Sequence, residues 1–181
     1  MSKKQDILTA ALNLFTEQGA RATSTKSIAL EAGVSEALIF KHFGTKDNLL
    51  EDLIKKGYVE AVRITNHFLN AEKESDFLAQ FIELPLHLVT NQFDFWRMQY
   101  KILPLNQIAQ HYHINFMKPS RSRLIETFEA LNYPQAETEA EIVLLLIDNL
   151  WKSFVSERLS AETCEEMILL LKKKYGLENE L

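Results

Sequence analysis

The stretch that decides the fold is Ser24 to Lys46, which reads STKSIALEAGVSEALIFKHFGTK. Two short segments with helical spacing are separated in it by Ala-Gly-Val-Ser. Gly33 allows a sharp turn at that point, and the hydroxyls of Ser24 and Ser35 can each accept a backbone N–H from the first turn that follows. The stretch therefore predicts a helix–turn–helix whose second helix runs from Glu36 to about Phe43.

Helical patterns lie on both sides of this motif. Apolar residues recur at helical spacing from Lys3 to Gln18. Thr45 is placed to cap a long helix that begins at Lys46 and ends near Asn70. We therefore predict a compact three-helix domain over residues 1–47 and a larger domain over residues 48–181.

The rest of the chain also reads as helix. Five glycines and four prolines in 181 residues are few for sheets joined by tight turns, so the predicted class is all-α. We expect Ser75 to cap a helix that Pro85 kinks and that ends near Asn91. Pro119 suits the first turn of another helix. The larger domain is accordingly predicted to be a helical bundle.

Composition excludes several classes of protein. The net charge of −5 argues against a uniformly basic nucleic-acid coat, and the one cysteine, Cys164, excludes an internal disulfide or a zinc site built from several cysteines. No apolar run approaches the roughly 20 residues of a membrane span, and the amphipathic N-terminus does not read as a secretion signal. We therefore expect a cytoplasmic protein without a membrane anchor.

Catalytic and cofactor patterns are missing from the sequence. His111 and His113 are two residues apart, which points them to different sides of a helix, so no metal site is predicted. The five glycines are too scattered for a phosphate-binding loop, and no serine stands between glycines in a nucleophile motif. We expect no cofactor and no enzymatic activity.

The helix–turn–helix is accompanied by further residues that carry a family resemblance. They are Phe15 and Gly19 in the preceding segment, Ile28 and Ala29 before the turn, and Ile39, Phe40, His42, Phe43, Thr45 and Lys46 after it. Over about the first 55 residues the chain resembles the N-terminal domain of the TetR family of transcriptional repressors. The remainder fits that family in length and helix layout.

The resemblance implies a homodimer that binds a near-palindromic operator in double-stranded DNA and is released by a small molecule. Positions at which family members touch base edges hold Lys26, Glu36, Ala37 and Leu38. Positions that commonly meet phosphates hold Ser24, Thr25, Phe40, Lys41, His42 and Lys46. Ser35, at the start of the second helix, completes the predicted DNA-binding set. Glu36 and Phe40 depart from the residues usual in the family, which are lysine or a neutral residue and tyrosine.

Two features of the larger domain suggest a ligand and a partner. An aromatic segment and the middle of a long helix supply the residues predicted to bind the small molecule, which are Trp96, Tyr100, His111, Asp148 and Trp151. The helix around residues 139–154 is apolar nearly all round, so it must be covered on two sides. A partner subunit can cover one side, together with the last helix, as the resemblance implies for the homodimer; a fully buried monomer core is the other interpretation.

Two alternatives remain open from the sequence. The chain could be a helical enzyme or small-molecule carrier that does not bind DNA, in which case the first 50 residues are only structural. It could also be an architectural DNA-binding protein without a ligand, which a solid apolar core in the larger domain would favour.

Overall fold

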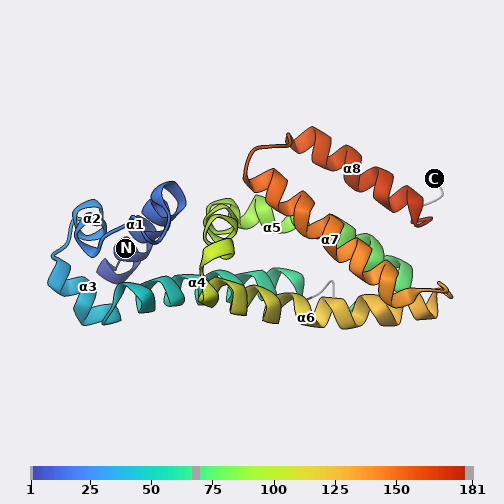
Figure 1. Ribbon diagram of the computed structural model, residues 1–181, viewed down its shortest axis with the longest axis horizontal. Helices are drawn as coiled ribbons and strands as arrows, with labels where there is room; N and C mark the ends of the chain where they lie inside the picture. The colour runs from blue at the N-terminus through green and yellow to red at the C-terminus, as the bar shows by residue number, and fades with distance from the viewer. Residues whose placement is uncertain (1, 67–69, 178–181) are drawn as a thin grey trace. The chain divides into compact units, whose positions relative to one another are not determined.

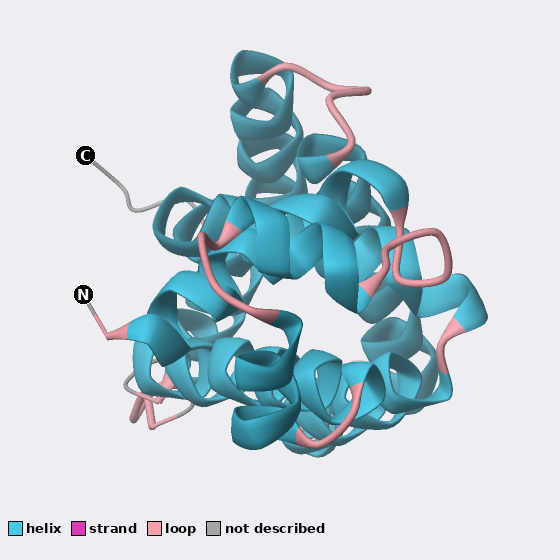
Figure 2. Ribbon diagram, turned by 90° about the vertical axis from the view of Figure 1, so that its left-hand side faces the viewer, coloured by secondary structure: helices cyan, strands magenta, loops and turns pink. Residues whose placement is uncertain are grey.

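The structure is a computed structural model that describes residues 2–66 and 70–177. Eight α-helices and one short 3-10 helix form the regular structure of these residues, which contain no β-strand (Figure 1). Short loops join the helices, as Figure 2 shows. The all-α prediction is confirmed. Among the helices of the described ranges, none is long and apolar enough to span a bilayer.

The first three helices begin where the sequence predicts. They are α1 (Lys3–Gln18), α2 (Thr25–Glu31) and α3 (Glu36–Phe43). The side chains of Ser24 and Ser35 cap α2 and α3 by accepting backbone N–H groups of the first turn. Capping depends on residues within one turn, and this local dependence explains why the sequence predicts where these helices begin.

The turn between α2 and α3 depends on one glycine. Gly33 has a φ of 62°, in the left-handed region that a side chain disfavours. The backbone N–H of Val34 then donates to the Ala29 carbonyl at 3.0 Å, which closes the turn.

Five longer helices and the 3-10 helix complete the described chain. They are α4 (Lys46–Thr65), α5 (Glu74–Ile102), η1 (Leu103–Leu105), α6 (Gln107–Ala130), α7 (Ala136–Val155) and α8 (Ala161–Lys174).

Several predicted helix boundaries in this part are wrong. α4 ends at Thr65 rather than near Asn70, and the segment 67–69 lies outside the described residues. α5 begins before Ser75 and continues through Pro85 without a break, but it leaves helical geometry at Gln92 (φ −143°, ψ 41°), next to the predicted end near Asn91.

α6 likewise continues through Pro119, which was expected to begin a new helix. A proline inside a helix removes one backbone hydrogen bond and costs about 3 kcal/mol. Burial of neighbouring apolar side chains, such as Leu84 and Leu88 beside Pro85, offsets that cost. Predicting a helix end from a proline alone leaves out this stabilisation by tertiary packing.

The chain packs into two compact units. The first unit contains the residues up to Glu60 together with Asp94–His113, and the second contains Ala61–Phe93 and the chain from Ile114 onward. α4, α5 and α6 each contribute residues to both units. The predicted division after residue 47 concerns function and stays a prediction.

The core of the first unit joins α1, α2 and α3 to the start of α4. Its fully buried side chains include Ile7, Phe15, Ile28, Ile39, Leu49, Leu50 and Ile54. Further along α4, Tyr58 packs edge-on against Phe95 and Trp96, with both ring-centroid distances at 5.5 Å. The three-helix motif is thus continuous with an aromatic cluster contributed by α4 and the end of α5.

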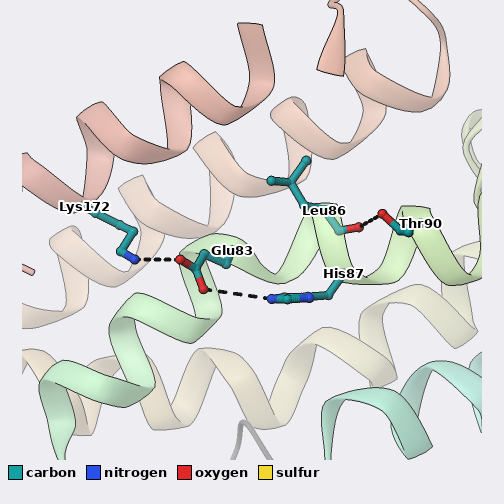
Figure 3. A network of polar contacts seen from close by, with 5 residues as sticks. All are labelled: Glu83, Leu86, His87, Thr90 and Lys172. Atoms are coloured by element: carbon teal, nitrogen blue, oxygen red, sulfur yellow. Dashed lines mark hydrogen bonds and ion pairs between the residues drawn. The ribbon is translucent and has the colours of Figure 1, made fainter. Parts of the chain in front are cut away.

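The second unit places α7 and α8 side by side in opposite directions (Figure 1). Polar contacts fix α8 to its neighbours. Lys172 on α8 donates to a Glu83 carboxylate oxygen on α5 at 2.6 Å, and His87 Nε2 lies 3.9 Å from the other oxygen (Figure 3). After α8, the Tyr175 hydroxyl donates to Glu139 at 2.9 Å, and burial together with that carboxylate raises the pKa of Tyr175.

Candidate nucleic-acid interface and internal cavity

α3 has one buried and one exposed face. Ile39 and Phe43 are buried against the first-unit core, whereas Ala37, Lys41 and His42 are exposed. Spacings of three and four residues place the two sets on opposite sides of the helix. The exposed face contains most of the positions that the sequence predicts to meet DNA.

Phe40 and Leu38, which are also predicted to meet DNA, lie at the edges of this face. Phe40 is 46% exposed, although it is a large aromatic side chain. Leu38 is half-buried, and its backbone N–H is held by the Ser35 cap. Both side chains are therefore accessible beside a fixed helix start.

The first turn of α2 supplies a second group of predicted residues. Ser24 is committed to a capping box with Ser27, and Lys26 is exposed beside it. Lys26 therefore adds a positive charge close to the unsatisfied N–H groups of a helix N-terminus, a combination that favours anions.

Thr25 and Glu36 are joined across the turn of the motif. The Thr25 hydroxyl donates a short hydrogen bond to a Glu36 carboxylate oxygen. This bond links the first residue of α2 to the first residue of α3, so Glu36 does not extend freely into solvent. Both residues are predicted DNA contacts, and no sequence pattern indicates their pairing.

Lys46 has protein partners in addition to its predicted role. Its ammonium donates to the carbonyls of Ala20 and Thr23, both at 2.7 Å. The ammonium thereby fastens the α1–α2 loop to the N-terminus of α4. A third N–H remains for a phosphate.

A second lysine, which the sequence analysis missed, acts on the same region. Lys101 near the end of α5 donates to the carbonyl of Glu17 in the last turn of α1 at 2.6 Å. A cation at a helix C-terminus is stabilising because the last carbonyls lack intrahelical partners. Backbone acceptors leave no side-chain signal, so nothing in the sequence pointed to Lys101.

The residues predicted to bind a ligand divide between the two units. Trp96, Tyr100 and His111 belong to the first unit, and Asp148 and Trp151 belong to the second. Trp96 and Trp151 are fully buried, whereas His111 is exposed. Their part in ligand binding stays a prediction.

The first unit also contains a buried polar chain that the sequence did not reveal. The Gln99 amide, which is fully buried, donates to the Tyr58 hydroxyl at 2.9 Å and to the Ala109 carbonyl at 3.0 Å. The Tyr58 hydroxyl lies 3.1 Å from His113 Nδ1. These bonds connect α4, α5 and α6 within the unit. Among the described residues, no cluster of three or more His, Cys, Asp or Glu side chains is arranged to hold a metal ion.

A cavity of about 270 Å³ lies within the second unit. The described residues that line it come from α4, α5 and α6 and from the residue after α4; they are Val62, Thr65, Asn66, Phe77, Phe81, Leu84, Asn115, Phe116, Pro119 and Ser120. None of the five predicted ligand residues is among them. Trp151 lies behind the wall, with its ring 6.5 Å from that of Phe116.

The second unit also exposes large apolar side chains on one side of α7 and α8. We call these the α7/α8 apolar face; they are Ile142, Leu145 and Leu146 on α7 and Met167 and Leu170 on α8. Leu145 is 69% exposed. A shallow groove lined by Leu146, Met167 and Leu170, among others, joins the two helices into one surface.

Comparison with known proteins gives a family match for the N-terminal part. Residues 7–53 match the profile described as bacterial regulatory proteins, tetR family. An HTH-type transcriptional repressor of Mycobacterium tuberculosis strain H37Rv is 35% identical over 77 residues, which is 42% of this chain and 39% of the repressor. The matched part of the chain thus spans about two fifths of the length of that relative.

Solved structures extend the similarity in fold to the whole chain. A TetR-like transcriptional regulator from Rhodococcus sp. RHA1 has a TM-score of 0.74 at 19% identity, with 98% of this chain and 97% of that chain covered. The regulator FadR from Bacillus subtilis, solved in complex with stearoyl-CoA, has a TM-score of 0.71 at 17% identity, with 93% and 96% covered. At these identities the likeness concerns the fold.

Proposed function

We propose that this chain, whose residues 7–53 match the profile of bacterial regulatory proteins, tetR family, is a homodimeric, ligand-responsive transcriptional repressor of that family. The observation that carries the proposal is the helix–turn–helix with its outward face on α3. A helix of this kind, fixed at its start and exposed along one side, fits the major groove of B-DNA. In this proposal residues 1–47 bind DNA, and residues 48–181 bind the ligand and the partner.

Charged and apolar side chains have different roles in binding DNA. Lys26, Lys41 and His42 are exposed and meet phosphates, which fixes the position of the motif on the duplex. Ala37 and Leu38 lie near the start of α3, where base edges are reached, and a leucine suits the methyl group of thymine. Phosphate contacts supply affinity, and these two residues supply preference among sequences.

Glu36 is proposed to read a base while Thr25 holds it. One carboxylate oxygen accepts from the Thr25 hydroxyl, which leaves the other oxygen for a donor on the DNA. In the major groove the cytosine amino group is such a donor. The pairing with Thr25 fixes the direction of the carboxylate and so limits its repulsion of nearby phosphates.

The homodimer forms through the α7/α8 apolar face. Lys172 holds α8 against α5 on its inner side, so the opposite side of the helix is available to a second copy. Exposed leucine, isoleucine and methionine in one continuous patch are typical of a protein–protein contact. Two related α3 helices then require two related half-sites, which is a near-palindrome.

The effector is proposed to enter the cavity of the second unit. A cavity between α4, α5 and α6 can change the angle at which these helices meet when it is filled. The FadR of Bacillus subtilis, similar in fold, was solved with stearoyl-CoA, which supports a ligand in a fold of this kind. A cavity of about 270 Å³ also argues against an architectural DNA-binding protein with a solid second core. Because its partner is DNA, we place the protein in the cytoplasm.

The test is selection of binding sites from random duplex DNA, followed by titration at several salt concentrations. We expect enrichment of a near-palindrome and a steep fall in affinity as salt rises. Lys41→Ala should lower the slope of log K against log salt by about 1, because one phosphate contact is lost. Lys152→Ala, an exposed lysine on α7, is the control and should leave the slope unchanged. Failure to enrich any sequence would refute the proposed function.

A further inference from the structure

The size of the cavity in the second unit limits the molecule that it can hold. This inference rests on the proposed function, because it treats the cavity as the effector site. Its volume is about 270 Å³. A closed apolar cavity of about 150 Å³ is enough for one benzene ring. By the same scale, this cavity has room for a two-ring compound of about ten or eleven non-hydrogen atoms.

The walls of the cavity select against charge. No Asp, Glu, Lys, Arg or His is found among the described residues that line it. Burying an ion without a partner is strongly unfavourable, so an anion or a cation is a poor occupant. Phe77, Phe81 and Phe116 instead offer aromatic surface, and the first two rings are stacked with centroids 6.0 Å apart. A neutral ring system is therefore the kind of molecule that fits this cavity.

Two buried hydroxyls in the wall give the cavity a polar point. Ser120 is 5% exposed, and it lines the cavity from α6. Thr65 is 3% exposed, and its hydroxyl reaches only the Val62 carbonyl at a long 3.4 Å. A ligand group that hydrogen-bonds to one of these hydroxyls is favoured over an apolar group of the same shape.

We propose that the effector is an uncharged two-ring compound that carries a hydroxyl group. The ligand hydroxyl can accept a hydrogen bond from Ser120 or donate one to Thr65. The rings lie among the three phenylalanines. Ser120 and Thr65 are therefore the residues that determine specificity for the hydroxyl.

Three probes that share a naphthalene ring system test the class of ligand on the full chain. They are 2-naphthol, 2-methylnaphthalene and 2-naphthoate, and binding is measured by titration calorimetry at neutral pH. We expect 2-naphthol to bind at least tenfold more tightly than 2-naphthoate, because the anion finds no partner in the wall. Equal or tighter binding of 2-naphthoate would overturn the proposal, as would the absence of binding by 2-naphthol up to its solubility limit.

Serine variants on one helix test the hydroxyl contact. Ser120→Ala should weaken 2-naphthol binding about three- to tenfold, as expected for one neutral hydrogen bond, and leave 2-methylnaphthalene binding unchanged. Ser122→Ala, an exposed serine on the same helix, should alter neither. Thr65→Val provides an independent variant of nearly equal volume with the same expected pattern. If Ser120→Ala weakens both probes equally, the serine is packing and the assignment is wrong.

The two proposals fail in different measurements. Operator binding without any binding of 2-naphthol would reject the ligand class and leave the DNA-binding function standing. Binding of 2-naphthol by a chain that selects no DNA sequence would support the ligand class and reject the repressor function.

Discussion

The Lys46 ammonium hydrogen-bonds to the protein and is also proposed to contact DNA. Two of its three N–H groups are directed to the carbonyls of Ala20 and Thr23, so the loop between α1 and α2 is held by α4. A lysine at a helix N-terminus is expected to meet phosphate, and that expectation omits these partners. The residue therefore has a structural effect that can be measured without DNA.

Replacing Lys46 with alanine should reduce both stability and DNA affinity. Loss of two hydrogen bonds from a charged donor in a half-buried site should lower the free energy of unfolding by about 1–3 kcal/mol. Urea unfolding measures this directly. The control is Lys41→Ala, which removes an exposed lysine of α3 and should weaken DNA binding without changing the urea midpoint. An unchanged midpoint for Lys46→Ala would mean that the two carbonyl contacts contribute nothing.

Side chains could be predicted as DNA-facing from the sequence, whereas their partners could not. The exposed positions of α3 follow from helical spacing once the caps are known, and Lys41 and His42 are where that spacing places them. The pairing of Thr25 with Glu36 depends on the angle between α2 and α3, which no local pattern encodes. Lys101 contacts a backbone carbonyl, and every residue has one.

At the scale of helices, the crossing of α4 and α5 depends on one glycine. A Cβ atom placed on Gly57 would lie 2.0 Å from Cε2 of Phe95. The glycine therefore lets the Phe95 ring lie directly on the α4 backbone, where it also packs against Tyr58 and Trp96. Gly57 is inside a helix, where glycine is intrinsically unfavourable, so its presence is explained by this contact.

Gly57→Ala should destabilise the protein despite the better helix propensity of alanine. The gain in propensity is at most about 1 kcal/mol. Overpacking a filled core costs about 1–3 kcal/mol, because the Phe95 ring or the helix must move. Thermal unfolding should show a lower midpoint. A Phe95→Leu substitution in the same chain should remove part of the penalty, so a double-mutant cycle that is strictly additive would contradict this account.

The accuracy of the helix predictions follows from what ends each helix. α1, α2 and α3 begin at side-chain caps, and local chemistry fixes their bounds. α5 and α6 pass through Pro85 and Pro119 because packing outweighs one lost hydrogen bond. Gln92, where α5 departs from helical geometry, lies beside the helix end that the sequence predicts near Asn91.

At the scale of the whole molecule, the ligand cavity was beyond sequence reasoning. Its lining comes from α4, α5 and α6, whose packing no local pattern specifies, and aromatic residues in the sequence can fill a core as well as line a cavity. Trp96 proved to be fully buried with other rings around it, while Phe77 and Phe81, in an unremarked part of the sequence, line the space. Only packing distinguishes the two cases.

The sequence indicates that α7 is apolar nearly all round. Such a helix must pack against other protein on two sides. One side of α7 packs inside the second unit, where Val143, Leu144 and Ile147 are buried. Leu145, on the other side, is largely exposed. If a second copy covers it, a charge placed there must be desolvated in the dimer, and this cost opposes association.

Leu145→Glu should therefore convert the dimer to a monomer and weaken binding to a full palindrome. A monomer contacts one half-site, so the affinity contributed by the second half-site is lost unless the protein concentration is high enough to restore the pair. Light scattering coupled to size exclusion gives the mass, and titration of full and half operators gives the ratio of affinities. Leu105→Glu is the matched control, since Leu105 is a 71% exposed leucine of the first unit. A Leu145→Glu chain that stays dimeric would place the interface elsewhere, whereas a monomer that keeps full preference for the palindrome would separate DNA recognition from dimerisation.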